Sequence, residues 1–139
     1  MKKSILISLG LILLLSCQES KKTQLIEAEL VVQKILDLPK LQWIYHPELN
    51  KRLPVKVLET ELINKNLNLK KFGQSVKIMS KFQLEKEGIK DFLIFNKLKI
   101  KTDTTDFELL YKIEGVGSAG RLVKENEEWI VLDYSVWEN

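Results

Sequence analysis

The second half of the chain alternates apolar and polar residues, and this period of two restricts the fold more than any other feature. Successive side chains of a strand point to opposite faces, so each alternating stretch predicts a half-buried strand. The four stretches are residues 76–82, 98–100, 107–113 and 130–136. Turn signals such as Glu87-Gly88 and residues 102–106 lie between them. Because a parallel crossover needs a dozen or more residues, this spacing predicts antiparallel neighbours.

A different period precedes these strands. Apolar residues recur at steps of three and four, which is typical of an amphipathic helix with one wide buried stripe; they are Leu25, Ala28, Val32, Ile35 and Leu36. Thr23 is the expected N-cap and Pro39 the expected stop, so we expect a helix over residues 23–37. Leu30 and Val31 widen the stripe, which predicts packing against a broad surface such as a sheet.

The segment between this helix and the alternating stretches is less regular. Residues 39–54 contain all three prolines and predict an irregular connector. Residues 55–62 fit either a strand or a helix, and we expect a short strand because Val55 and Val57 alternate with polar residues. The sequence therefore predicts one α+β domain over residues 23–139, in which an N-terminal helix packs on a four- to five-stranded antiparallel meander sheet.

The first 17 residues differ in composition from the rest. Lys2 and Lys3 precede an almost unbroken apolar run of 12 residues, 4–15, which is shorter than the roughly 20 residues that a membrane-spanning helix needs. A basic start, a short apolar region and a small residue, Ser16, are typical of a signal peptide. The closing sequence Leu14-Leu15-Ser16-Cys17 resembles the lipobox of bacterial lipoproteins.

This resemblance implies a lipid anchor. In that class the Cys thiol carries diacylglycerol, the peptide is cut just before it, and the new amino terminus is acylated. Residues 1–16 would then be the signal peptide, and residues 17–22 the lipidated Cys17 with a polar tether. A thioether to lipid would also consume a thiol that otherwise forms intermolecular disulfides in an oxidising compartment. Gln18 after the Cys, where Asp would favour the inner membrane, implies attachment to the outer membrane of the cell envelope.

The charge balance restricts the partners. The full chain has 22 basic and 19 acidic residues, and removal of Lys2 and Lys3 leaves 20 against 19. A nearly neutral domain gives no electrostatic case for nucleic-acid binding. A composition that is 45% hydrophobic and 29% charged also excludes a disordered chain and a multispan membrane protein.

The end of the chain carries a second resemblance. Residues 128–135 (Glu-Trp-Ile-Val-Leu-Asp-Tyr-Ser) follow an Asn-Glu turn and form a Trp-containing last strand. With the helix that precedes the strands, this ending resembles small cystatin-like and NTF2-like bacterial domains. The resemblance bears on the fold alone, because such folds carry enzymes, inhibitors and inert modules.

Few residues are available for catalysis or metal binding. One Cys and one His exclude multi-Cys zinc sites, Fe–S clusters and internal disulfides, and we expect no metal. His46, between Tyr45 and Pro47, could act as a general base, but only Glu48 lies at a suggestive spacing. We expect an exposed loop histidine.

Asp133 is the second candidate for acid–base chemistry. By parity it shares a strand face with Trp129, Val131 and Trp137, whose apolar surroundings would raise the pKa of its carboxyl if they lined a cavity. The opposite face is more uniformly apolar (Ile130, Leu132, Tyr134 and Val136) and is the better candidate for the core. Asp133 is therefore expected on the outer face, and we predict no catalytic residue.

Two further patterns have simple structural interpretations. Residues 115–120 (Gly-Val-Gly-Ser-Ala-Gly) match the dinucleotide fingerprint, but two predicted strands follow instead of a helix, so we expect a bulged or flexible hairpin connection and no cofactor. Ser118 within it lacks the first Gly of a nucleophile elbow. Lys97, Lys99 and Lys101 form a basic stripe that could meet anionic headgroups or acidic sugars, although such stripes more often protect an edge strand from pairing.

These observations favour a small membrane-anchored envelope lipoprotein whose domain is a non-enzymatic binding module for a protein or a small apolar ligand. The alternative is an NTF2-like enzyme that uses general acid–base chemistry in a helix-covered pocket. A third interpretation, a passive inhibitor or immunity-like protein, cannot be separated from the first by sequence. An enzyme requires a concave pocket with ionisable groups of shifted pKa, whereas a binding module requires a flat or grooved apolar patch.

Overall fold

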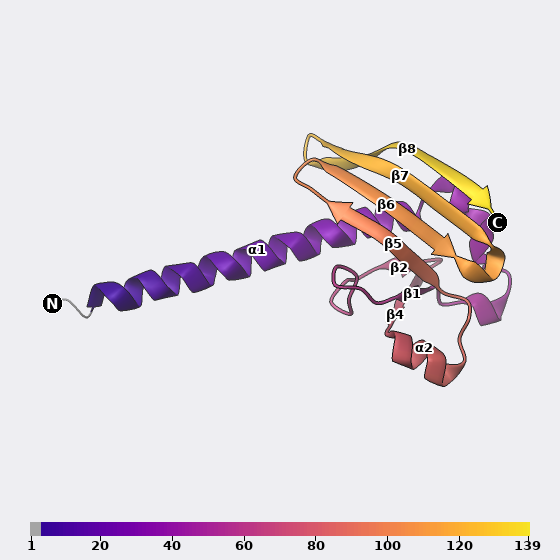
Figure 1. The fold of residues 1–139 in the computed structure, drawn as a ribbon, viewed down its shortest axis with the longest axis horizontal. Helices are drawn as coiled ribbons and strands as arrows, with labels where there is room; N and C mark the ends of the chain where they lie inside the picture. Colours follow the sequence, from indigo (N-terminus) through magenta and orange to yellow (C-terminus); the bar gives the residue numbers. More distant parts are fainter. Residues whose placement is uncertain (1–3) are drawn as a thin grey trace.

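The computed structural model describes the backbone of residues 4–139 and the side chains of residues 18–139. A long N-terminal helix crosses one face of a sheet, so the protein is α+β as predicted (Figure 1). The helical elements are α1 (Ser4–Leu36), the 3-10 helices η1 (Pro39–Tyr45), η2 (Asn50–Arg52) and η3 (Lys112–Glu114), and α2 (Lys81–Glu87). The strands are β1 (Lys56–Leu58), β2 (Lys70–Lys71), β3 (Gln74–Ser75), β4 (Lys77–Met79), β5 (Leu93–Ile100), β6 (Thr104–Tyr111), β7 (Val116–Glu125) and β8 (Glu128–Glu138).

The main sheet has six strands in the order β4-β1-β5-β6-β7-β8. Strands β5 to β8 form the predicted antiparallel meander. The expectation of a purely antiparallel sheet is wrong at the other side, because β1 pairs in parallel with both β4 and β5. The connections there are long enough for parallel crossovers, since residues 59–76 join β1 to β4 and α2 lies between β4 and β5. Strands β2 and β3 form a separate hairpin.

The buried stripe of α1 is confirmed. Ala28, Val31, Val32, Ile35 and Leu36 are all at most 1% exposed, and the helix ends at Leu36, shortly before Pro39. Its spacing matches the 3.6-residue turn, so one side of the last three turns packs against the sheet. Leu30 departs from the expectation, because it is 48% exposed on the opposite side of the helix.

The start of α1 differs from the prediction. The helix does not begin at Thr23 but runs without a break through the segment expected to be a polar tether. Thr23 is therefore no N-cap: its hydroxyl donates to the carbonyl of Glu19, one turn earlier, at 3.0 Å. Lys2 and Lys3 of the expected signal peptide and the side chain of Cys17 lie outside the described residues.

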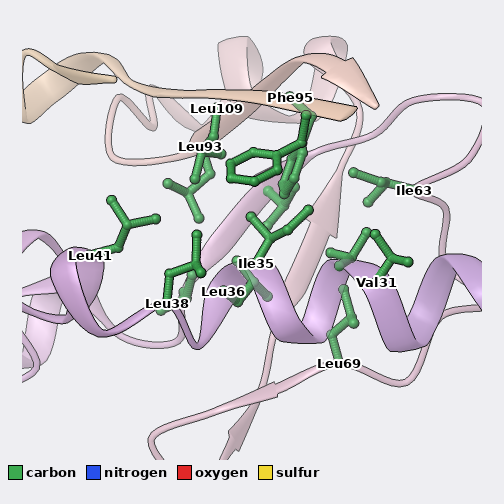
Figure 2. Packing of buried hydrophobic residues seen from close by; sticks show 14 of the residues in the cluster. Val31, Ile35, Leu36, Leu38, Leu41, Ile63, Leu69, Leu93, Phe95 and Leu109 are labelled. Atoms are coloured by element: carbon green, nitrogen blue, oxygen red, sulfur yellow. The ribbon is translucent and has the colours of Figure 1, made fainter. Parts of the chain in front are cut away.

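The proline-rich connector supplies part of the core. In η1, Leu41, Ile44 and Tyr45 are at most 1% exposed, and the Tyr45 hydroxyl donates to the Leu36 carbonyl at 2.9 Å. Ile44 and Tyr45 belong to the same core cluster, and Figure 2 shows Leu41 with other apolar side chains of this cluster between α1 and the sheet. The connector is irregular as predicted, and η1 within it closes the end of α1.

Residues 55–62 form a strand only over Lys56–Leu58, which confirms the expected short strand. The stretch 76–82 is a strand only over Lys77–Met79, because the Ser80 hydroxyl caps a new helix by accepting from the Gln83 amide N–H at 3.2 Å. Phe82, expected on this strand, lies instead in α2 and is 71% exposed.

Strand β8 changes faces in the middle. Val131 pairs with Leu122 and Asp133 with Arg121, so Leu132 has no partner in β7 and forms a bulge. Before the bulge Trp129 points to the core, and after it Tyr134 does. The predicted core face of this strand is therefore correct only for Tyr134 and Val136, whereas Ile130 and Leu132 are 42% and 60% exposed.

Candidate functional site

An apolar groove lies on the face of the sheet opposite α1, beneath α2. Its floor is formed by Leu58 of β1 and Ile94 of β5. Each follows a residue that points to the core, Val57 and Leu93 respectively, so its own side chain points to the opposite face of the sheet. Leu84, Ile89 and Phe92 complete its apolar lining, and its volume is about 530 Å³. It is half-open, so a ligand in it would keep one side in contact with water or with a second surface.

The local sequence explains why this groove forms. The capping box of Ser80 and Gln83 begins α2, and Gly88, with φ of 66°, ends it after seven residues. The amide N–H of Ile89 then donates to the Leu84 carbonyl at 2.9 Å, which turns the chain back toward the sheet. Residues of the crossover therefore face Ile94 across a gap that the short helix does not fill.

The groove continues into a second hollow of about 320 Å³, which shares Gly88, Ile89 and Lys90 with it. Ile113 of η3 gives this end an apolar wall, and Lys51, Arg52 and Asp91 give it charge. Lys51 and Lys90 have no carboxylate within 4.0 Å among the described side chains. The lining of the extended groove is thus apolar with an unneutralised basic rim.

Two ion pairs fix the wall of this second hollow. Lys56 Nζ lies 2.9 Å from Asp91 Oδ2, and the lysine side chain is 8% exposed. Arg52 donates to Glu114 Oε1 at 2.6 Å and to the Tyr111 hydroxyl at 3.3 Å. Because these charges are already paired, they hold the chain segments together and leave Lys51 and Lys90 as the charges available to a ligand.

His46 lies outside the groove in a polar cluster of its own. It is half-buried, with φ of 47°, at the end of η1. Its Nδ1 is 2.8 Å from Glu48 and its Nε2 is 3.4 Å from Glu114. The hydrogen bond to Glu48 raises the pKa of His46 above its usual 6.5, and the Glu114 carboxylate adds to this. Both ring nitrogens face carboxylates, so neither is directed to a substrate.

The sequence anticipated only part of this cluster. Glu48 lies two residues from His46 and could be identified from the sequence. Glu114 lies in η3, 68 residues later in the chain, and only the tertiary fold brings it close to His46. The histidine is less exposed than expected for the same reason. The cluster ties the loop after η1 to η3, which is a structural role.

The other sequence candidates do not converge on one place. Asp133 is exposed on the outer face, as expected, opposite Arg121 of β7. Trp129 and Val131 are no longer on its face, because the bulge at Leu132 separates them. Asp133 therefore has no apolar cavity around it in the described part of the chain.

The glycine-rich motif belongs to a strand. Only Gly115, with φ of 64°, lies in a turn, so the expected hairpin connection is wrong for residues 116–120, which begin β7. A Cβ at Gly117 would overlap the indole of Trp137, so this glycine allows close cross-strand packing. Ser118 is buried, and its hydroxyl donates to the Ser135 carbonyl at 2.9 Å.

The lysine stripe lies on the outer face of β5. Lys97 and Lys99 stand opposite Glu108 and Asp106 of β6. Strand β1 pairs with β5 only at Leu93, so in the described chain the lysine-bearing half of β5 has no strand on its other side. This position agrees with a role in protecting an edge from pairing.

Sequence reasoning missed the groove because its lining combines Leu58 with residues between Lys81 and Ile94, a stretch that shows no clear period. The usable signal was Ser80-x-x-Gln83 before Leu84, followed by Gly88, which is the signature of a short capped helix. Among the described residues, no cluster of His, Cys, Asp or Glu is arranged to hold a metal ion, and no helix is long and apolar enough to span a membrane.

Comparison of the chain with protein-family models, curated proteins and solved structures gives no significant match.

Proposed function

We propose that this protein is a small lipoprotein of the bacterial cell envelope, anchored through Cys17, whose domain binds an apolar segment of another protein in the groove beneath α2. The observation that carries the proposal is the half-open apolar groove lined by Leu84, Ile89 and Phe92, with a basic rim. Exposed apolar grooves with polar borders are typical of protein-interaction sites.

A binding role fits the residues better than catalysis. The polar side chains at the groove are Lys81, Glu85 and Lys90, which are flexible surface groups and not a positioned acid–base pair. His46 is not among the residues that line the groove or its extension, and its nitrogens are already paired. The helix-covered face of the sheet, where an NTF2-like enzyme would have its pocket, is packed with apolar side chains.

The form of the groove favours a protein segment over a small ligand. Small-molecule sites bury about 70–90% of their ligand, which a half-open groove does not achieve. A protein segment covers the open side with its own chain. Lys51 and Lys90 at the rim favour a segment whose apolar residues are flanked by acidic ones.

The anchor is tested by Cys17→Ser. The variant is expected to remain as an uncleaved precursor that takes up no labelled palmitate, because the thioether is the signal for both processing steps in the class that the lipobox resembles. Incorporation of palmitate at the level of the parent protein would contradict the proposal. Western blotting of fractionated envelopes measures the precursor, and the outer-membrane assignment implied by Gln18 is measured on the same fractions.

The groove is tested with the anionic apolar dye anilinonaphthalene sulfonate, titrated by fluorescence. Ile89→Asp is expected to weaken dye binding about tenfold, because covering the partly exposed isoleucine with the dye contributes roughly 1.5 kcal/mol. Lys90→Glu should weaken it as well, and more at low salt. The matched control is Leu132→Asp, which changes an exposed leucine at the bulge, outside the groove.

The possible results of this titration distinguish the groove from other apolar surfaces of the protein. Loss of dye binding in Ile89→Asp and Lys90→Glu, with retention in Leu132→Asp, supports the groove. Equal binding in Ile89→Asp and the parent, or equal loss in Leu132→Asp, would place the apolar site elsewhere and refute the proposal. Circular dichroism of each variant checks that the fold is kept.

A further inference from the structure

Helix α1 connects the proposed anchor to the domain without an interruption. It runs from Ser4 to Leu36, so Cys17 and Ala28, the first fully buried residue among the described side chains, belong to one helix. At about 1.5 Å per residue, these two positions are roughly 17 Å apart along the axis. The segment after the anchor is thus a rigid helical spacer, where the sequence predicted only a polar tether.

The composition of the spacer does not favour insertion into the membrane surface. Residues 18–24 (Gln-Glu-Ser-Lys-Lys-Thr-Gln) contain no apolar side chain. Interfacial helices need an apolar face that inserts into the headgroup region. The segment can only stand in water, with Lys21 and Lys22 close enough to attract anionic lipids.

The packing of α1 determines which end of the sheet is near the anchor. Glu27 accepts from Lys124 Nζ at 2.8 Å and from Trp129 Nε1 at 2.6 Å, which fixes the turn between β7 and β8 beside it. Ile100, at the end of β5, borders a hollow together with Ser20 and Glu27. The turns that close β5–β6 and β7–β8 therefore lie toward the membrane, as the direction of α1 in Figure 1 shows.

The groove lies at the other end. Its floor residue Ile94 precedes Ile100 by six residues along β5, which corresponds to about 20 Å at 3.3 Å per residue. Its extension ends at Ile113 in η3. This 3-10 helix follows Tyr111, the last residue of β6, whereas the β5–β6 turn precedes Thr104 at the other end of the strand. The groove thus opens beyond the membrane-proximal turns.

From these placements we infer that α1 holds the domain upright and presents the groove to a protein partner in the aqueous space, away from the lipid of the anchoring membrane. The inference rests on the proposed anchor at Cys17. The partner must then reach the groove from the aqueous side, as a soluble protein or the exposed part of a protein from another layer of the envelope does, and it is not a lipid chain of the anchoring membrane.

The test uses the full lipidated protein in anionic phospholipid vesicles. Cys17 is the single cysteine of the chain, so once its sulfur carries lipid, one added cysteine can be labelled alone. Asp103→Cys, in the turn between β5 and β6, carries a fluorophore at the membrane-proximal end. Lys112→Cys carries it at the distal end. Quenching by headgroup-nitroxide lipids is expected to be several-fold stronger at position 103 than at position 112.

A pair of spacer variants tests the role of the helix. Lys21→Pro with Lys22→Gly breaks α1, and the difference in quenching between the two positions should then disappear. Lys21→Ala with Lys22→Ala removes the same charges, keeps the helix and should preserve the difference. Persistence of the difference in the proline variant would show that α1 does not set the orientation and would overturn the inference.

The failures remain distinguishable. Protein that does not float with the vesicles refutes the proposed anchor. Protein that floats but is quenched equally at both positions in the parent spacer refutes the upright orientation. Equal quenching is the result expected for a domain lying on its side, with the exposed Ile26 and Leu30 of α1 against the bilayer.

Discussion

Glu27 joins the first helix to the last strand, and its replacement tests how much that junction stabilises the fold. Its carboxylate accepts from Trp129 Nε1 at 2.6 Å, and the Trp129 side chain is only 2% exposed. In Glu27→Ala the indole N–H is left buried without an acceptor, which costs about 1–3 kcal/mol of unfolding free energy. Glu27→Gln keeps an amide oxygen for the indole and should cost less than about 1 kcal/mol.

The measurement is urea unfolding followed by tryptophan fluorescence, on a chain that begins at Gln18. The control is Lys34→Ala, which changes an exposed residue of the same helix and should be nearly neutral. If Glu27→Ala and Glu27→Gln destabilise equally, or if the alanine variant lies within about 0.5 kcal/mol of the parent, the indole bond does not carry the junction.

The same contact has a pH dependence. Partial burial raises the pKa of Glu27, but the hydrogen bonds from Lys124 and Trp129 outweigh this and lower the pKa below 4.5. A lowered pKa in the folded state means that the stabilisation is present above pH 4.5 and is lost as the pH falls through the folded value. The difference between the parent and Glu27→Ala should therefore shrink in acid.

Two other changes have definite outcomes. Gly117→Ala should lower stability by about 1–3 kcal/mol and shift the emission of Trp137, because the new methyl group overlaps its ring; unchanged emission would contradict this packing. His46→Gln should remove the stabilisation that the ion pair between His46 and Glu48 provides. Because the pKa of His46 is raised, this stabilisation is lost as the pH rises through that raised pKa. Because the pKa of Glu48 is lowered by the hydrogen bond from His46, the stabilisation is also lost in acid, as the pH falls through the lowered pKa of Glu48. Melting temperatures of parent and variant should therefore differ most at mildly acidic pH and converge once the pH exceeds the raised pKa of His46.

The elements that could be predicted are those whose periodic pattern is long. The stripe of α1 spans three turns, and Phe107, Leu109 and Tyr111 alternate along β6, so each pattern identifies its own buried face. The ends of β6 were not predicted, because the strand begins at Thr104, in the expected turn, and Ile113 lies in η3 and is 45% exposed. Strand β1 has three residues, too few to show a period, and its parallel pairing depends on partners elsewhere in the chain. The bulge at Leu132 reverses the parity of β8, so a pattern read through it assigns half of the strand to the wrong face.

The candidate site was less predictable than the fold. A groove is space that several elements leave unfilled. Here Leu58 belongs to β1, Ile89 to the loop after α2 and Ile94 to β5. Of the two isolated residues that attract attention in the sequence, His46 pairs with Glu48 and Glu114, and Asp133 lies exposed on the outer face. Only the short capped helix that begins after Ser80 could have indicated that this region is built differently from the meander.

The pairing of the first helix with the last strand also bears on when the domain can fold. The bond between Glu27 and Trp129 spans 102 residues, and that between Lys40 and Tyr134 spans 94. Contacts of such long range form late, because the loop must close before they stabilise anything. A chain that emerges from a ribosome with its N-terminus leading cannot complete the packing around Glu27 until the final strand has followed. Synthesis of the last dozen residues would thus set the moment at which this part of the core closes, and a chain that stops before β8 would leave this end of the core open to proteases and chaperones.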